Sequence, residues 1–231
     1  MIFPKDKFAA IRSLLEAVAG RENVRNADSD VLLHSYDSGI DRARPLAVID
    51  IRKAAWVQPV VKLLSNAKIP FVARGCATNL SGGAICLKNG VILNLAPLDK
   101  ILRIDTQNDS AVVEPGVINN KLQEALEPLG YFYAPDPASM KAGTLGGNVA
   151  ENAGGPRCLK YGVTLNHVLA ADIVTPEGEL IRLSANDGGP GLLNLFTGSE
   201  GTMGIAVRLE LRILKKPPHA QTALCAFPNS Q

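Results

Sequence analysis

The chain has 231 residues, 46% of them hydrophobic, and its 24 lysines and arginines almost balance its 22 aspartates and glutamates. This composition is typical of a globular protein with a buried core, and the lack of a basic excess argues against binding nucleic acid or acidic membranes by charge alone. No apolar run reaches the length of a membrane span and MIFPKDKFAA is no secretory signal, so we expect a cytoplasmic protein. The four cysteines lack metal-site or disulfide spacing, so we expect reduced thiols and no metal.

The first hundred residues alternate between helical and strand-like patterns. Apolar residues recur at helical spacing over 8–18 and are followed by Gly20, which predicts an amphipathic helix with a glycine at its end. A strand is predicted at 46–50, a helix at 56–67 and a second strand at 69–73. This order implies a parallel pair joined by a crossover, so the loop after the second strand would lie where α/β sheets bind ligands.

The rest of the chain is predicted to form an antiparallel sheet with helices. The clearest pattern is GIAVRLELRIL at 204–214, where apolar and charged residues alternate as in a half-buried antiparallel strand. The fold class is therefore α+β, with a small parallel α/β subdomain over 1–99 and a larger antiparallel subdomain over 100–216. The other predicted elements are strands at 101–105 and 110–117, a helix at 122–129 capped by Asn119 or Asn120, and a hairpin at 167–183.

Glycine and other small residues gather in three stretches, at 71–83, 135–163 and 196–205. Glycine lets a backbone approach a ligand closely. The first stretch alone leaves two alternatives open: an amide nest for a phosphate, with Thr78 and Ser81 as further donors, or a tight loop that merely needs glycine. The chain has neither a P-loop nor a Rossmann motif. Together the three stretches therefore indicate one long ligand held by a different nucleotide-binding fold.

VARGCATNLSGGA, PDPASMKAGTLGGNVAENAGGPRCLKYGVT and FTGSEGTMGI together resemble the PCMH-type FAD-binding domain of the vanillyl-alcohol oxidase family of flavoproteins. The resemblance runs in order from about residue 25 to 216. Within the family it is strongest to the branch that contains the D-type subunit of glycolate oxidase and D-lactate dehydrogenase. Some relatives attach FAD through a histidine where Thr78 stands, so noncovalent FAD is implied. The family's usual glycines are replaced by Ala77 and Asn79, and NDGGPGLLNLFTG departs from the family pattern beside the flavin edge.

The resemblance also implies a set of cofactor-binding residues. The pyrophosphate loop would comprise Arg74, Gly75, Cys76, Ala77, Thr78, Asn79, Ser81 and Gly82. The flavin and its ribityl chain would lie along Pro137, Ser139, Gly143, Thr144, Gly146, Gly147 and Asn148. The same wall would continue through Ala153, Gly154, Gly155, Pro156, Tyr161 and Gly162. The adenosine end would be reached by Glu200, Gly204 and Ile205.

The resemblance implies an oxidoreductase in which a D-2-hydroxy acid, such as glycolate or D-lactate, gives hydride to flavin. The electrons would pass to a partner, an iron–sulfur subunit or an electron-transfer flavoprotein, through which the protein could lie at a membrane periphery. A C-terminal domain beginning at 217–231 would supply the substrate residues. No catalytic base is assigned, because structural roles suit His34, His167 and His219 better. Two alternatives stay open: another oxidase of this fold, acting on a sugar lactone or aryl alcohol, and a noncatalytic FAD-binding or electron-transfer module.

Overall fold

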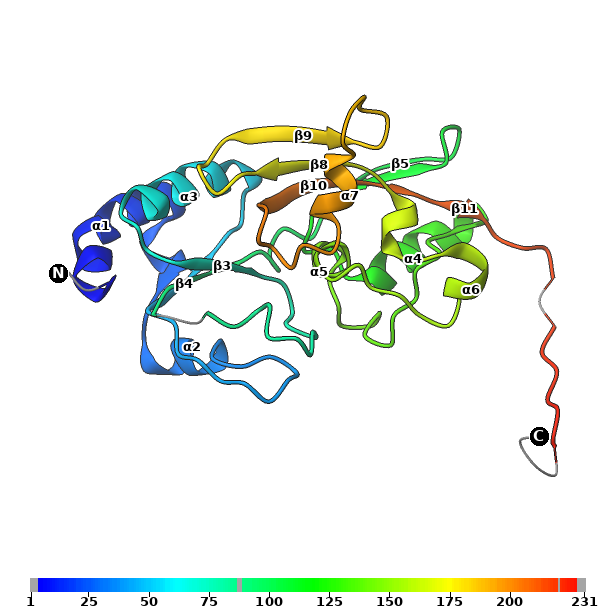
Figure 1. The fold of residues 1–231 in the computed structure, drawn as a ribbon, viewed down its shortest axis with the longest axis horizontal. Helices are drawn as coiled ribbons and strands as arrows, with labels where there is room; N and C mark the ends of the chain where they lie inside the picture. The colour runs from blue at the N-terminus through cyan, green and yellow to red at the C-terminus, as the bar shows by residue number, and fades with distance from the viewer. Residues whose placement is uncertain (1–3, 87–88, 220, 228–231) are drawn as a thin grey trace.

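The structure, a computed structural model, describes residues 4–86, 89–219 and 221–227 (Figure 1). The first sheet has the strand order β1-β2-β4-β3, in which β2, β4 and β3 run parallel and β1 pairs antiparallel with β2. Its elements are α1 (Pro4–Ala19), β1 (Val24–Arg25), α2 (Asp28–Leu33), β2 (Ala47–Asp50), α3 (Val57–Asn66), β3 (Phe71–Arg74) and β4 (Val91–Asn94), with short 3-10 turns at Arg21–Asn23 and Ala54–Trp56.

The crossover between β2 and β3 is confirmed in direction and corrected in pairing. The two strands are parallel, as predicted, but they are not neighbours, because β4 lies between them and pairs with both. β4 is apolar throughout its first three residues, which are all fully buried. The centre of a parallel sheet is covered on both faces, and a continuous apolar run such as this one suits that position.

The first sheet packs against α1 and α3. The buried positions of α3 are Val57, Val60, Val61 and Leu64, a spacing that places them on one face of a helix. They form a core with Leu15 of α1 and with inward side chains of the strands. Burying a side chain of this size stabilises a protein by roughly 1.5–3 kcal/mol, so this contact holds α3 and α1 on the sheet.

The second sheet is antiparallel, with the order β5-β6-β10-β8-β9, and α4 and α5 lie on one side of it (Figure 1). β10 occupies the centre; Leu209 and Leu211 are fully buried while Arg208 and Arg212 are exposed, which confirms the predicted alternation. The predicted pairing of the strands at 101–105 and 110–117 is confirmed, although the second strand ends at Val113, and the hairpin at 167–183 is confirmed as well. The elements are β5 (Ile101–Asp105), β6 (Ser110–Val113), α4 (Asn119–Leu126), β7 (Tyr131–Phe132), α5 (Leu145–Ala150), α6 (Cys158–Tyr161), β8 (Val168–Val174), β9 (Leu180–Ser184), α7 (Leu192–Phe196), β10 (Ile205–Arg212) and β11 (Leu214–Lys215), with 3-10 turns at Glu127–Leu129 and Thr164–His167.

The predicted cap of α4 is wrong. Ile118 occupies the N-cap position and makes no side-chain cap hydrogen bond. Asn119 is fully buried, and its amide donates to the carbonyl of Pro135, while Asn120 bonds Glu124. Asn119 therefore ties α4 to the chain that leads into the second glycine-rich stretch.

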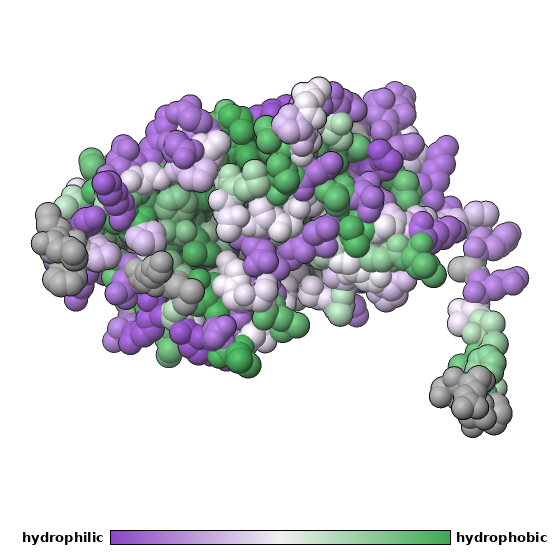
Figure 2. Space-filling model, viewed as in Figure 1, coloured by the Kyte–Doolittle hydropathy of each residue, from purple (hydrophilic) through white to green (hydrophobic). Residues whose placement is uncertain are grey.

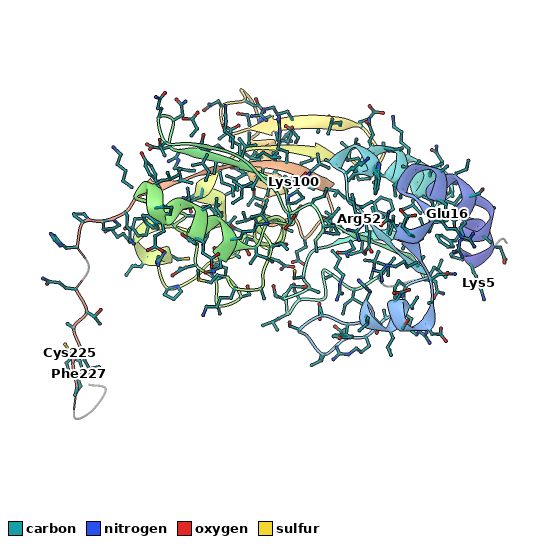
Figure 3. All side chains as sticks on the ribbon, turned by 180° about the vertical axis from the view of Figure 1, so that it is seen from behind. Lys5, Glu16, Arg52, Lys100, Cys225 and Phe227 are labelled. Atoms are coloured by element: carbon teal, nitrogen blue, oxygen red, sulfur yellow. The ribbon has the colours of Figure 1, made fainter. Side chains whose placement is uncertain are left out.

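The two sheets share packed side chains. Val174, Ile205 and Val207 of the second sheet belong to the core of the first. The strands of the first sheet all lie before residue 95 and those of the second after residue 100, although the division of the chain at 99 and 100 stays a prediction. After β11, the described residues from 217 to 227 extend from the body of the protein, with Cys225 and Phe227 near their end (Figure 3). That this segment begins a further domain also stays a prediction, and its last four residues lie outside the described ranges.

Candidate functional site

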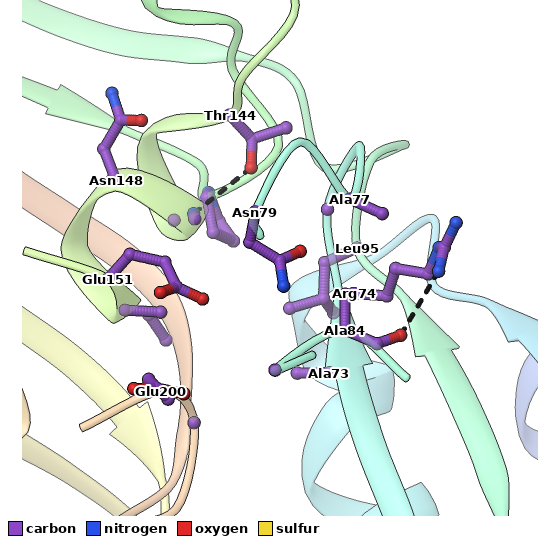
Figure 4. Close-up of a pocket in the computed structure, with 18 of the residues that line it drawn as sticks. Ala73, Arg74, Ala77, Asn79, Ala84, Leu95, Thr144, Asn148, Glu151 and Glu200 are labelled. Carbon is purple, nitrogen blue, oxygen red and sulfur yellow. Dashed lines mark hydrogen bonds between the residues drawn. The ribbon is translucent and has the colours of Figure 1, made fainter. Parts of the chain in front are cut away.

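A cavity of about 530 Å³ opens between the carboxyl end of β3 and the start of β10 (Figure 4). Residues from all three glycine-rich stretches line it, so the structure confirms that they converge on one space. Residues of intermediate hydropathy, drawn white, gather at the middle of this face of the molecule (Figure 2). The volume lies within the range of ligand pockets, roughly 300–1,000 Å³.

Many of the predicted site residues line the cavity: Arg74, Gly75, Cys76, Ala77, Thr78, Asn79, Ser81, Ser139, Thr144, Gly146, Gly147, Asn148, Ala153, Glu200, Gly204 and Ile205. The others do not: Gly82, Pro137, Gly143, Gly154, Gly155, Pro156, Tyr161 and Gly162. That any of them contacts a cofactor stays a prediction.

The loop after β3 presents unused backbone donors. Among the described residues, none of the backbone N–H groups of 76–83 donates a hydrogen bond to another residue. Ala77 has φ of 52°, in the left-handed region that costs an alanine conformational energy, at a position where the resemblance predicts glycine. A run of free amides in a turning loop is an anion nest, which suits the negative charge of a pyrophosphate.

The base of this loop is packed against α5. A Cβ placed on Gly75 would lie 2.3 Å from Thr144 Oγ1. Thr144 is the N-cap of α5, and its Oγ1 accepts a hydrogen bond from Gly147 N at 3.2 Å. Gly146 in turn donates its N–H to the carbonyl of Pro115 at 2.7 Å. The Gly75 backbone thus packs against the Thr144 side chain, and Gly146 holds α5 to the chain after β6; side chains on these glycines would disturb both contacts.

The third stretch is joined to α5 by two backbone hydrogen bonds. Gly198 N donates to Val149 O and Glu200 N donates to Ala150 O, each at 2.9 Å. Glu200 has φ of 53°, another left-handed residue without a glycine's freedom. Its side chain lines the cavity, where Figure 4 shows it on the same wall as Glu151.

Two carboxylates converge on Gly83. A Cβ built there would lie 3.1 Å from Glu151 Oε1 and 3.6 Å from Glu200 Oε2. Ser81 Oγ donates to Glu151 Oε2 at 3.0 Å, and among the described residues no cation forms a salt bridge with either glutamate. Burial raises the pKa of the Glu151 carboxyl, the Ser81 hydroxyl opposes this, and the charges of Glu200 and Asp37 raise the pKa further. This end of the cavity therefore suits hydroxyl or amine donors better than phosphate.

Arg74, at the end of β3, links the two ends of the loop that follows this strand. The residue is 8% exposed and its Nη1 donates to the carbonyl of Ala84 at 3.2 Å, so both ends of the loop are tied together (Figure 4). Burial lowers the pKa of Arg74, while the charge of Asp37 raises it. Partial desolvation raises the pKa of the neighbouring Cys76 thiol more than Arg74 lowers it. A thiol in this state is a weak nucleophile.

The glycines outside the cavity allow close contact between chain segments. A Cβ on Gly155 would lie 2.2 Å from the carbonyl oxygen of Asp136, and one on Gly154 would lie 2.9 Å from Cys158 Sγ. Gly162 has φ of 81°, in the left-handed region that favours glycine. Packing thus gives Gly154 and Gly155 a structural reason, and backbone conformation gives one to Gly162.

None of the three histidines lines the cavity. His167 is 3% exposed and bonds the carbonyl of Tyr161 through Nε2. Burial lowers its pKa, the hydrogen bond to that carbonyl raises it, and the charge of Arg212 lowers it. His34 bonds the carbonyl of Asp30, and His219 is exposed on the C-terminal segment. All three positions agree with structural or surface roles.

Sequence reasoning missed several lining residues: Ala73, Leu80, Gly83, Ala84, Leu95, Pro115, Ala150, Glu151, Phe196, Ser199, Gly201 and Ala206. Most are chain neighbours of predicted residues, so widening each stretch would have found them. Nothing in the sequence marks Leu95 and Pro115 as cavity residues, because they lie in ordinary core segments that the fold brings to the cavity.

The cavity lining has the properties that FAD requires. The free amides of the loop suit a pyrophosphate, the carboxylates suit sugar hydroxyls, and Leu95, Phe196 and Ile205 supply apolar surface for a ring. Within 4–86, 89–219 and 221–227, no cluster of three potential metal ligands occurs, and no helix is long and apolar enough to cross a membrane.

Comparison with known proteins agrees with this lining. The family model of the FAD binding domain matches residues 45–184. Glycolate oxidase subunit GlcD of Bacillus subtilis (strain 168) is 38% identical over 224 residues, covering 95% of this chain and 48% of the relative. A D-lactate dehydrogenase of Anaerostipes hadrus is 39% identical over 192 residues, covering 81% of this chain and 40% of the relative. The chain therefore spans about half the length of the curated relatives it matches.

The fold is shared with solved structures at lower identity. Alkyldihydroxyacetonephosphate synthase superposes with a TM-score of 0.83 at 21% identity, covering 91% of this chain and 41% of that chain. At this identity the likeness concerns the fold alone. The family model, by contrast, covers more than half of the chain. The chain thus belongs to the FAD-binding domain family, with the PCMH-type fold of the vanillyl-alcohol oxidase flavoproteins and FAD as its cofactor.

Proposed function

We propose that this chain is the FAD-binding portion of an oxidoreductase that oxidises a D-2-hydroxy acid of the glycolate or D-lactate type. The observation that carries the proposal is the convergence of the three glycine-rich stretches on one cavity whose loop offers unused backbone N–H groups. The names of the relatives, glycolate oxidase subunit and D-lactate dehydrogenase, support the substrate class. Bound FAD supplies the hydride acceptor for such an oxidation.

The residues divide into groups by the part of FAD they would hold. The backbone amides of 76–83 would bind the pyrophosphate, with the hydroxyl of Thr78 as a further donor. Glu151 and Glu200 would accept hydrogen bonds from sugar hydroxyls. The stretch from Thr144 to Asn148 would lie along the flavin, where a backbone without bulky side chains permits close contact.

FAD is proposed to be held without a covalent bond. No histidine or tyrosine of the described residues lines the cavity, and Thr78 is not a group that attaches flavin. The cavity's thiol, Cys76, has a pKa raised by desolvation, which disfavours the nucleophilic thiolate.

The substrate residues are not assigned, because none of the described histidines faces the cavity. We propose that the remaining length of the enzyme supplies them, and that an iron–sulfur subunit or an electron-transfer flavoprotein receives the electrons. The word "subunit" in the name of the Bacillus relative supports a partner of this kind.

The first experiment is a visible absorption spectrum of the purified chain with added FAD, before and after denaturation. Structured, shifted flavin bands that are fully released on denaturation support noncovalent FAD in this cavity. A protein that stays colourless at high FAD concentration would overturn the proposed site, and colour retained after denaturation would overturn noncovalent binding.

The substrate class is tested on the protein as its gene encodes it. Under anaerobic conditions, D-lactate or glycolate is expected to bleach the flavin band, and L-lactate is the matched control. Bleaching by a sugar lactone or an aryl alcohol, with no response to either hydroxy acid, would replace the proposed substrate class by another oxidation on the same fold.

A further inference from the structure

A short segment before the matched family region packs on the pyrophosphate loop. Residues 36–42, which we call the clasp, form a closed loop in which Tyr36 and Arg42 pair as an antiparallel bridge. Arg42 also lies over the Tyr36 ring and donates to the carbonyl of Gly39. The clasp is held closed by its own contacts, and its chain lies beside the loop after β3 (Figure 1).

Asp37 is the buried centre of the clasp. Its residue is 6% exposed although it carries a carboxylate, and it does not line the cavity. Oδ1 accepts a hydrogen bond from Gly39 N at 2.7 Å, and Oδ2 accepts one from Asn79 Nδ2 at 2.8 Å. A buried carboxylate is costly unless it is hydrogen-bonded, and these two bonds join the clasp to the pyrophosphate loop.

Two further contacts join the clasp to the pyrophosphate loop. Ser38 Oγ donates to the carbonyl of Ala77 at 3.3 Å, and a Cβ on Gly39 would lie 3.0 Å from the carbonyl of Leu80. Ala77 is the residue of the loop that adopts a left-handed conformation. Such a conformation persists only when surrounding contacts hold it, and the clasp contacts Ala77 itself and the residues Asn79 and Leu80 that follow it.

We propose that Asp37 is a positioning residue for the cofactor: through Asn79 it holds the pyrophosphate loop in its binding conformation before FAD arrives. The inference rests on the proposed placement of the pyrophosphate. A loop that is ordered in advance loses less conformational entropy on binding, so its affinity is higher than that of the same loop left free. The family model begins at residue 45, after the clasp.

If Asp37 positions the loop, removing its carboxylate should weaken FAD binding, whereas charge alone predicts tighter binding. Asp37 is negative and FAD is an anion, so removing the carboxylate would tighten binding if long-range repulsion dominated. Asp41 provides the matched control: it lies in the same clasp, its carboxylate lies 3.8 Å from a Cβ built on Gly82, and among the described residues its side chain makes no hydrogen bond. The two aspartates therefore separate positioning from charge.

The experiment measures FAD affinity for the full chain and the variants Asp37→Ala, Asn79→Ala, the double variant and Asp41→Ala. We expect D37A to raise the Kd for FAD on the order of tenfold, which corresponds to about 1.4 kcal/mol, and D41A to leave it unchanged or lower it. In the N79A background, D37A is expected to change the Kd by much less, because the positioning contact is already lost. A D37A variant that binds like D41A, or fully additive single effects, would overturn the inference.

Hydrogen exchange of the FAD-free protein separates this inference from the proposed site. Exchange of the Ile85 amide, which donates to the carbonyl of Gly82 at the end of the loop, is expected to accelerate in D37A and in N79A, and to stay at the wild-type rate in D41A, with β8 as the internal reference. Unchanged exchange in either of the first two variants would refute positioning by Asp37. Wild-type protein that fails to bind FAD would refute the site instead, and the exchange data would still judge the role of Asp37. N79A serves as the test if D37A does not fold, because Asn79 is on a partly exposed loop.

Discussion

Gly75→Ala tests the packing on which the cavity depends. The added Cβ would lie 2.3 Å from Thr144 Oγ1, 3.2 Å from its Cγ2 and 3.3 Å from its Cβ, and Thr144 is 3% exposed with little room to move. Gly75 is not among the glycines with positive φ, so an alanine meets no backbone strain there. Any loss of stability must therefore come from the collision.

The loss in the free energy of unfolding caused by Gly75→Ala follows from three effects. Overpacking costs about 1–3 kcal/mol, and displacing Thr144 forfeits its N-cap hydrogen bond to Gly147, worth about 1 kcal/mol. The lower entropy of the unfolded chain returns roughly 0.4–1 kcal/mol. We expect a net loss of about 2 kcal/mol in the free energy of unfolding, together with weaker FAD binding.

Chemical denaturation measures the loss, and Gly188→Ala is the matched control. Gly188 has nothing within 4 Å of its built Cβ and no positive φ, so that variant should stay within about 0.5 kcal/mol of the wild type. A Thr144→Ala background removes Oγ1 and Cγ2 and leaves only the Cβ contact at 3.3 Å, so Gly75→Ala should cost far less there than it does alone. If G75A were as stable as G188A, the close packing of the loop base against α5 would be refuted.

Three further predictions concern pH and the core. The raised pKa of Glu151 means that the folded state binds more protons than the unfolded state just above pH 4.5, so the contribution of Glu151 to stability falls as pH rises through this window. Denaturation measured at a series of pH values should show a flatter dependence of stability on pH for E151Q than for the wild type. An unchanged dependence would contradict the shift. The lowered pKa of His167 has the opposite sign: stability falls as pH drops below 6.5, because the unfolded chain takes up the proton first, and H167N should lose this dependence. Leu93→Ala, at a fully buried residue of β4, should cost about 2–5 kcal/mol in denaturation, whereas Leu14→Ala, at a residue 51% exposed, should cost little; equal losses would refute the assigned core.

Most of the fold was predictable because its elements have strong local patterns. The alternation in β10 and the spacing of the buried Leu122 and Leu126 in α4 each follow from burial of one face, and burial of one face is visible in the order of residues. The pairing of β2 with β4 was not predictable in this way. A parallel strand that is buried on both faces is apolar throughout, so its sequence does not indicate which strand it pairs with. The cap of α4 failed for a related reason: Asn119 has a cap residue's chemistry, but a tertiary contact to Pro135 claims its amide.

The candidate site was predictable to the level of its stretches. Glycine-rich segments signal close backbone approach, but the approach can be to a ligand or to another part of the chain. Gly155 shows the second case, packed against Asp136, and Gly75 shows that a glycine beside the cavity also serves packing. The pairing of Glu151 with Glu200 had no sequence signal, because the two residues are far apart in the chain.

The sequence by itself determined the class of fold, the three glycine-rich stretches and the family, because these depend on residue types in local order. Only the tertiary structure decided which of these residues face one cavity, how two carboxylates meet at Gly83, and that Asp37 reaches across to Asn79. The physical reason is that a hydrogen bond or a collision acts over a few ångströms of space. Residues 37 and 79 become neighbours only after the sheet has placed the ends of their segments together.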